Sequence, residues 1–365
     1  MIRTTAESPH TPEPSLLRHF TGSIIFTIVA LALGAFVGWE YSGTVEGMLG
    51  TLWICSVLAV LEVSLSFDNA AVNATVLKDM DPIWQRRFLT WGIAIAVFGM
   101  RIVFPIVIVA IAASLGPWGA LMLAINEPDT YARIMNDAHT GLMGFGGAFL
   151  GMVGLKYFFD ADKEIHWIRV IEGPLAKFGR LQAFEIGVMI LAIWGTSTLL
   201  EGEERLTFLT AGLFGLLTFI AVEMIGDVLG APEETTGVAA KSGLASFLYL
   251  EVLDASFSFD GVIGAFALST NLFVIAIGLG IGAMFVRSMT IYLVHQGTMS
   301  EYRFLEHGAF YAILVLAAIM FLNVEYHIPE VVTGLIGAVL IGLAFFSSLR
   351  WNRAELRRDQ AGIQA

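Results

Sequence analysis

Long apolar runs decide what this chain can fold into. Ten of them could cross about 30 Å of hydrocarbon as helices, at 20–39, 51–77, 88–114, 141–159, 183–200, 206–229, 244–269, 272–294, 307–323 and 329–349. The chain is 56% hydrophobic and only 14% charged, which is typical of a polytopic membrane protein rather than a soluble domain. We therefore predict an all-α polytopic membrane protein of about ten transmembrane helices. The run at 183–200 is the weakest, because Glu185 lies at its start, and 117–126 resembles a re-entrant or interfacial piece.

The distribution of Lys and Arg predicts the orientation of these spans. If the N-terminus is cytoplasmic, fifteen of the 20 basic residues lie in inside segments, whereas the outside loops hold only Arg133 and Arg205. Such an excess marks the cytoplasmic side. Both termini are thus expected inside, with residues 1–18 a disordered cytoplasmic tail and 350–365 a second tail. Eight spans would keep the same orientation.

Two nine-residue stretches of the sequence are near copies of each other, and both carry acids inside apolar runs. Residues 61–69 read LEVSLSFDN and residues 253–261 read LDASFSFDG. A carboxylate at mid-bilayer costs roughly 2.5–3.5 kcal/mol on insertion scales. A chain that carries the same acidic pattern twice is therefore expected to use it, most simply to bind a cation.

The two stretches predict an inverted repeat. They lie in the second and seventh runs, so they cross the membrane in opposite directions, an arrangement common in secondary transporters with a site at the repeat interface. Arg101 and Arg287 follow in the next run of each copy. Two inverted three-helix repeats are expected at 51–159 and 244–323, with linking spans at 183–229 and flanking spans at 20–39 and 329–349.

The predicted site contains only oxygen ligands. The expected metal ligands are Asp68, Asp260, Glu62, Asp254, Asn69, Ser66 and Ser258. Such a set suits Mn²⁺, Ca²⁺ or Mg²⁺ better than Zn²⁺ or Cu⁺. Residues advance by 100° along a helix, so Glu62 and Asp68 can reach one ion only if the helix loosens between them. Neighbouring carboxylates also take up protons when no cation is bound, which predicts protons as the coupled ion.

Other polar residues are expected to lie around the site or along an ion path: Ser64, Ser256, Arg101, Arg287, Glu223, Asp227 and Glu251. Each also has a structural interpretation. Asp68 and Asp260 could be charge partners of the two arginines that fix helix packing, although a salt bridge would not need the repeated serines. Glu223 and Asp227 could be solvated acids at a helix end, and Glu251 an ordinary helix-end residue.

At these stretches the chain resembles the TerC family of bacterial integral membrane proteins, within the LysE-like transporter superfamily. The resemblance is carried by Glu62, Ser66-Phe67-Asp68-Asn69 and Arg101, and by Asp254, Ser258-Phe259-Asp260 and Arg287. Gly261 departs from the serine usual in that family. The resemblance covers the two repeats and implies export of manganese or a related divalent cation from the bacterial cytoplasm across the inner membrane. It also implies an association with tellurite resistance.

Two other functions stay open from sequence. A membrane factor that binds or loads metal without transporting it would use the same residues. An intramembrane aspartyl protease could use Asp68 and Asp260, although its usual Tyr-Asp and Gly-x-Gly-Asp contexts are missing; we therefore expect no enzyme. The expected partners are the lipid bilayer, a divalent cation and protons, and a homodimer stays open. Nucleic acid is not expected, since no basic cluster is present.

Overall fold

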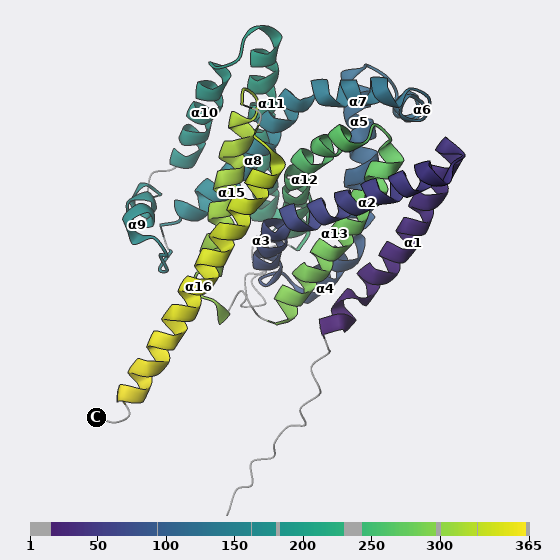
Figure 1. Ribbon diagram of the computed structural model, residues 1–365. Helices are drawn as coiled ribbons and strands as arrows, with labels where there is room; N and C mark the ends of the chain where they lie inside the picture. The colour runs from purple at the N-terminus through teal and green to yellow at the C-terminus, as the bar shows by residue number, and fades with distance from the viewer. Residues whose placement is uncertain are drawn as a thin grey trace, which may run out of the picture.

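The structure is a computed structural model that describes residues 16–92, 94–161, 163–179, 183–229, 243–296, 301–326 and 328–362, and these residues form helices and no strand (Figure 1). The first part comprises α1 (Leu16–Ser42), α2 (Val45–Leu65), α3 (Phe67–Leu77), α4 (Pro82–Arg87), the π-helices η1 (Phe88–Gly92) and η2 (Ile95–Val103), α5 (Phe104–Ala112), α6 (Pro117–Asn126), α7 (Pro128–Asp137) and α8 (His139–Phe158). The second part comprises α9 (Arg169–Phe178), α10 (Phe184–Ser197), α11 (Gly202–Leu229), α12 (Gly243–Leu268), α13 (Leu272–His295), α15 (Leu305–Leu322) and α16 (Glu330–Gly362).

Among the described residues, eight helical segments are long and apolar enough to cross a membrane: His19–Ser42, Val45–Leu65, Ile95–Ala112, His139–Phe158, Gly202–Ile225, Leu272–His295, Leu305–Leu322 and Val331–Glu355. The chain is therefore a polytopic helical protein of the membrane class, as predicted. Helices also occupy the other two predicted runs, but α10 has only 14 residues and the acid-bearing α12 is not among the eight. The interfacial piece predicted at 117–126 is the short helix α6.

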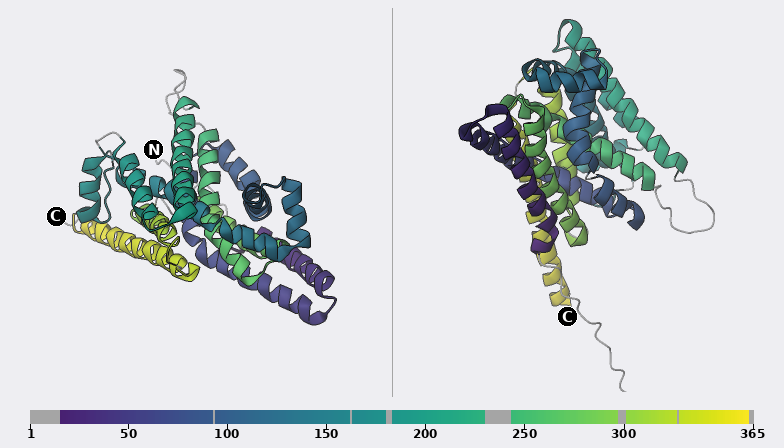
Figure 2. Two further views of the ribbon diagram at one scale, coloured as in Figure 1. Left: turned by 90° about the horizontal axis from the view of Figure 1, so that it is seen from above. Right: turned by 90° about the vertical axis from the view of Figure 1, so that its right-hand side faces the viewer.

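Two helical hairpins lie on opposite sides of a central group of helices (Figure 1). The hairpin of α1 and α2 lies on one side and that of α15 and α16 on the other, with α3, α8, α12 and α13 between them (Figures 1 and 2). The main apolar core joins α8, α11, α12 and α15, and a second cluster joins α5, α7, α12 and α13. The helix α12, which carries the second acidic stretch, thus belongs to both cores.

Close contact between α2 and α13 depends on glycine. A Cβ at Gly278 would lie 3.1 Å from the carbonyl oxygen of Cys55, and one at Gly282 would lie 3.0 Å from that of Ala59 and still closer to the side chain of Glu62. Small residues four positions apart allow membrane helices to approach this closely. The spacing places Glu62 directly against α13.

We expect Gly282→Val to destabilise the protein by about 1–3 kcal/mol, because an overpacked contact must push α2 away from α13. The measurement is thermal unfolding of the purified protein in detergent. Gly187→Ala is the control, since nothing lies within 4 Å of a Cβ at that position of α10. Equal stability of the two variants would contradict the close contact.

The first acidic stretch is broken at Ser66. The helix α2 ends at Leu65 and α3 begins at Phe67, with Ser66 between them at φ −100° and ψ 19°. The second stretch behaves differently, because α12 runs without interruption through Asp254 and Gly261. The unusual turn that Gly261 would have permitted is not formed, so the loosening occurs in only one of the two copies.

Candidate functional site

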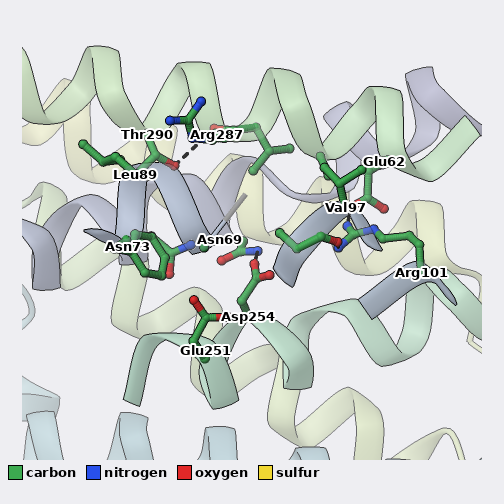
Figure 3. A pocket seen from close by; sticks show the side chains of 15 residues that line it. Glu62, Asn69, Asn73, Leu89, Val97, Arg101, Glu251, Asp254, Arg287 and Thr290 are labelled. Atoms are coloured by element: carbon green, nitrogen blue, oxygen red, sulfur yellow. Dashed lines mark hydrogen bonds and ion pairs between the residues drawn. The ribbon is translucent and has the colours of Figure 1, made fainter. Parts of the chain in front are cut away.

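A cavity of about 40 Å³, lined by both apolar and polar side chains, lies where the broken helix meets α12, α13 and the π-helical segment (Figure 3). Its walls are formed by Glu62, Asn69, Asn73, Phe88, Leu89, Gly92, Ala96, Val97, Arg101, Glu251, Asp254, Ala283, Val286, Arg287 and Thr290. A site that holds one water needs about 10–15 Å³ on this measure. The cavity can therefore hold a small ion with part of its hydration shell.

The π-helices η1 and η2 supply a whole wall of this cavity. Gly92 lets their backbone approach α12, since a Cβ there would lie 3.1 Å from Glu251 Oε1. In η2, Arg101 donates through Nη1 to the carbonyl oxygen of Ala96 at 2.6 Å. Extended π-helix is rare and is frequently found at functional sites.

Glu62 and Arg101 form a buried ion pair on one side of the cavity. The Arg101 Nη2 group donates to Glu62 Oε1, which also accepts from Ser66 Oγ at 3.3 Å. Glu62 is 7% exposed and Arg101 3% exposed. The guanidinium neutralises the carboxylate, so Glu62 is engaged by Arg101 and Ser66.

On the other side, Asn69 and Asp254 join the two acidic stretches. Asn69 Nδ2 donates to Asp254 Oδ1 at 2.7 Å across the junction of α3 and α12. Figure 3 shows these two side chains pointing toward one another, with Glu251 beside Asp254. This hydrogen bond joins residues 185 positions apart, one from each acidic stretch.

Three oxygen atoms around this contact lack hydrogen-bond donors. Asn69 Oδ1, Asn73 Oδ1 and Glu251 Oε1 are buried and have no partner in the described part of the chain. The two asparagines are 4% and 5% exposed. Leaving a buried acceptor unsatisfied costs about 1–3 kcal/mol. Three such acceptors lining one cavity next to a carboxylate make a set of free ligands for a cation.

The cavity is also asymmetric in charge. Glu62, Glu251 and Asp254 face Arg101 and Arg287, so three acids and two bases leave a formal charge of −1 when all are ionised. The Nε atoms of both arginines also lack a hydrogen-bond partner among the described residues. Water can bridge these donors, while the net charge favours a cation.

Asp68 lies away from the cavity. It is buried, its Oδ1 accepts from the backbone N–H of Asn69 at 2.9 Å, and a Cβ at Gly337 of α16 would lie 3.0 Å from its Oδ2. It therefore faces α16, and it forms no ion pair with Arg101. Consecutive side chains on a helix differ in direction by 100°. When Asn69 points at Asp254, Asp68 therefore points away from the cavity.

The predicted serines are occupied elsewhere. Ser64 is exposed and donates to the carbonyl oxygen of Val60 at 2.7 Å, and Ser256 donates to that of Val252 at 2.9 Å. Ser258 is buried but does not line the cavity.

Of the acids predicted along an ion path, Glu251 lines the cavity and Glu223 does not. Glu223 pairs with Lys156 of α8. The side chains of Asp260 and Asp227 lie outside the described residues, so the prediction that Asp68 and Asp260 are ligands of one ion lies outside them as well.

Sequence reasoning missed Asn73 and Thr290. Both are buried in the cavity wall. A signal was present, because Asn73 follows Asn69 by four residues and Thr290 follows Arg287 by three, which places each pair on one helix face. Within the described residues, no group of three or more His, Cys, Asp or Glu side chains could hold a metal ion. Any cation here would need the carboxamide oxygens as well as the acids.

The family described as "Protein of unknown function (DUF475)" matches residues 67–355. The chain belongs to this family. No curated protein and no solved structure matches it. The DUF475 match begins at Phe67, the first residue of α3, and ends within α16. It therefore contains every polar residue of the cavity except Glu62.

A second buried polar cluster of this DUF475 protein lies at the end of α8 and is organised around Glu172. Glu172 accepts from the backbone N–H groups of Trp167 and Ile168 at 3.2 and 3.1 Å and from Tyr311 Oη at 3.2 Å. Its Oε2 also faces Lys163 Nζ at 3.5 Å. An ammonium group this near argues against a metal on the same oxygen, so the cluster ties the segment 163–172 to α15.

Two pKa values in this cluster shift for opposite physical reasons. Burial lowers the pKa of Lys163 to about 8 from its usual 10.5, although Glu172 opposes that shift. Burial also disfavours the charged form of Glu172, but the Ile168 N–H, His307, Lys163 and the Trp167 N–H together hold its pKa below the usual value.

The segment 163–172 is accordingly expected to respond to pH in two steps. Ionised Glu172 stabilises it above a pH of about 4.5, and this contribution is lost as pH falls through its lowered pKa. Charged Lys163 destabilises it, so stability rises again between pH 8 and 10.5 as the buried amine loses its proton. Hydrogen exchange of peptides covering 163–172, corrected for intrinsic rates, measures both steps. Glu172→Gln should remove the acidic step, and an unchanged profile would contradict the assignment.

Proposed function

We propose that this protein is a multi-pass membrane carrier of divalent cations, with Mn²⁺ as the favoured substrate and protons as the coupled ion. One observation carries the proposal: Asn69, Asn73 and Glu251 direct unsatisfied oxygens at a buried cavity that also holds the Asp254 carboxylate. Ionisable groups placed inside a membrane are expensive and usually mark ion pathways.

The donor set supports a hard cation. Among its polar side chains the cavity has carboxylate, carboxamide and hydroxyl oxygens and neither His nor Cys. Such ligands suit Mn²⁺, Mg²⁺ and Ca²⁺, whereas Zn²⁺ and Cu⁺ prefer imidazole and thiolate. The resemblance to TerC proteins points to manganese among these three.

The packing supports the inverted repeat. In the proposed repeats, α2 and α3 correspond to α12, η2 corresponds to α13, and α8 corresponds to α15. The helix α2 packs on α13 while α12 packs on η2, and α3 packs on α15 while α12 packs on α8. Each contact between the two proposed repeats thus has a counterpart made by the corresponding helices of the other repeat. A two-fold axis in the membrane plane would require such pairs of contacts.

Sidedness follows from the basic residues. We place the protein in a bacterial inner membrane with both termini cytoplasmic and with ten spans, including α10 and α12. Lys78 at the end of α3 pairs with Glu306 in the first turn of α15 at 2.8 Å. Lys163 lies near the same end of α15, because it faces Glu172, which accepts a hydrogen bond from Tyr311. The proposed cytoplasmic side thus carries positive charge.

Proton coupling follows from energetics. Moving a 2+ ion outward against about 100 mV, inside negative, costs roughly 4.6 kcal/mol from the potential alone. Protons that return through the same acids offset that charge.

The test is uptake of Mn²⁺ by proteoliposomes that contain the purified protein. A carrier continues to accumulate Mn²⁺ beyond one ion per protein and responds to an imposed pH gradient, whereas a metal-binding factor stops at stoichiometric uptake. Stoichiometric uptake would exclude transport but keep the site. No binding of Mn²⁺, Mg²⁺ or Ca²⁺ would exclude both.

A further inference from the structure

The helix α9 presents an apolar face to its surroundings although it lies outside the long membrane-spanning helices. Val170 is 86% exposed and Ile171 is 47% exposed, and Phe178 is 47% exposed with one side of its ring stacked on Phe184. Pro174 is exposed as well. Positions 170, 171, 174 and 178 share one side of a helix, because at 100° per residue they fall within an arc of about 100°. A helix that faced water would carry polar residues there.

The opposite side of α9 is held by the protein. Glu172 is 1% exposed and accepts a hydrogen bond from Tyr311. His307 Nε2, nearer the start of α15, bonds the carbonyl oxygen of Ile165 at 2.8 Å. These contacts place α9 beside the first two turns of α15, at the level where a membrane span begins.

The exposed charges of α9 are all positive. Arg169 and Lys177 are exposed, whereas its one acid, Glu172, is turned inward and paired. Lys177 lies seven residues from Val170 and therefore on the same side as the apolar face. An apolar face bordered by basic residues is the pattern of helices that lie in the plane of a membrane interface.

From these contacts we propose that α9 is an in-plane interfacial helix that docks on anionic lipid. Val170, Ile171 and Phe178 enter the boundary between headgroups and acyl chains, and Arg169 and Lys177 bind lipid phosphates. Glu172 anchors the helix from the protein side and fixes the face that it turns to the lipid. This docking does not depend on the proposed transport.

A protein partner fits less well. The helix α9 contacts α15 through Glu172 and Tyr311, and α15 is long and apolar enough to span a membrane, so lipid would reach this level of the molecule. Basic residues near a membrane surface are attracted by anionic headgroups, so the charge on α9 is complementary to lipid as well.

The experiment uses full-length protein with Cys55 replaced by Ser and a spin label on a single cysteine at position 170 or 178. The chain has only this one native cysteine. A label at the exposed position 164, in the same segment, is the matched control. The samples are reconstituted in phosphatidylglycerol vesicles or in phosphatidylcholine vesicles, and collisions with oxygen and with a water-soluble nickel chelate are compared.

Labels at 170 and 178 should collide several-fold more with oxygen than the control does, and less with the nickel chelate. In phosphatidylglycerol, the double variant R169Q/K177Q should lose part of that difference, whereas in phosphatidylcholine it should lose little. Nickel access equal to that at position 164 would overturn the proposal. Protection from both reagents would also overturn it, because a protein partner or a second copy would then cover α9. Equal behaviour in the two lipids would overturn the role of anionic headgroups.

Discussion

Replacing Asp254 by Asn will lower the affinity for Mn²⁺ by about 100-fold or more and abolish its uptake. Mutation of residues that only support a metal ligand already costs 10–100-fold, so loss of a direct carboxylate is expected to reach at least the upper end. The substitution isolates the charge, because an Asn oxygen can still accept the hydrogen bond from Asn69. Isothermal titration in detergent and uptake into proteoliposomes measure the two effects.

Two further variants make this result specific. Asp137→Asn removes an exposed acid of α7 and should leave affinity within about two-fold. Asp68→Asn distinguishes the observed cavity from the site that the sequence pattern predicts, because Asp68 is a predicted ligand but faces α16 instead of the cavity. Loss of binding in Asp68→Asn with binding retained in Asp254→Asn would show that the cavity is not the ion site.

Arg101→Gln should destabilise the protein by about 3–5 kcal/mol, because Glu62 is left as a buried charge without its partner. Thermal or denaturant unfolding in detergent measures the loss. The double variant Glu62→Gln/Arg101→Gln should recover most of the stability, since neither side chain is then charged.

The control for this pair is Arg133→Gln, an exposed position in α7 where a change within about 0.5 kcal/mol is expected. A double variant as unstable as Arg101→Gln would mean that the guanidinium acts through packing or through Ala96, and not by neutralising Glu62.

Several parts of the site could be predicted from sequence because they follow from local rules. Repetition of an acidic stretch in two apolar runs pointed to Glu62, Asn69 and Asp254. A break after Glu62 was predicted on the condition that Glu62 and Asp68 bind one ion, and the helix breaks at Ser66 although Asp68 faces α16. Arg101, Arg287 and Glu251 were placed near the same site. All of these residues except Ser66 and Asp68 line one cavity.

The choice of partners could not be predicted. Asp68 is the acid that the repeat pattern emphasises most, yet Arg101 pairs with Glu62 and Asn69 bonds Asp254. These pairings depend on how far α3 is rotated after the break and on how closely α13 approaches α2 over Gly278 and Gly282. Neither quantity is visible in a pattern of residue types.

The amino-acid sequence by itself determined the membrane class, the helices and the residues that bring charge into the apolar interior. Helical hydrogen bonds join residues that are close together in the chain, and hydrophobicity is a property of each run. Both can therefore be predicted from the sequence. Tertiary structure alone decided which of those charges are neutralised and which oxygens are left facing a cavity. Neutralisation needs contact between helices far apart in the chain, and such contact is set by the packing of whole surfaces.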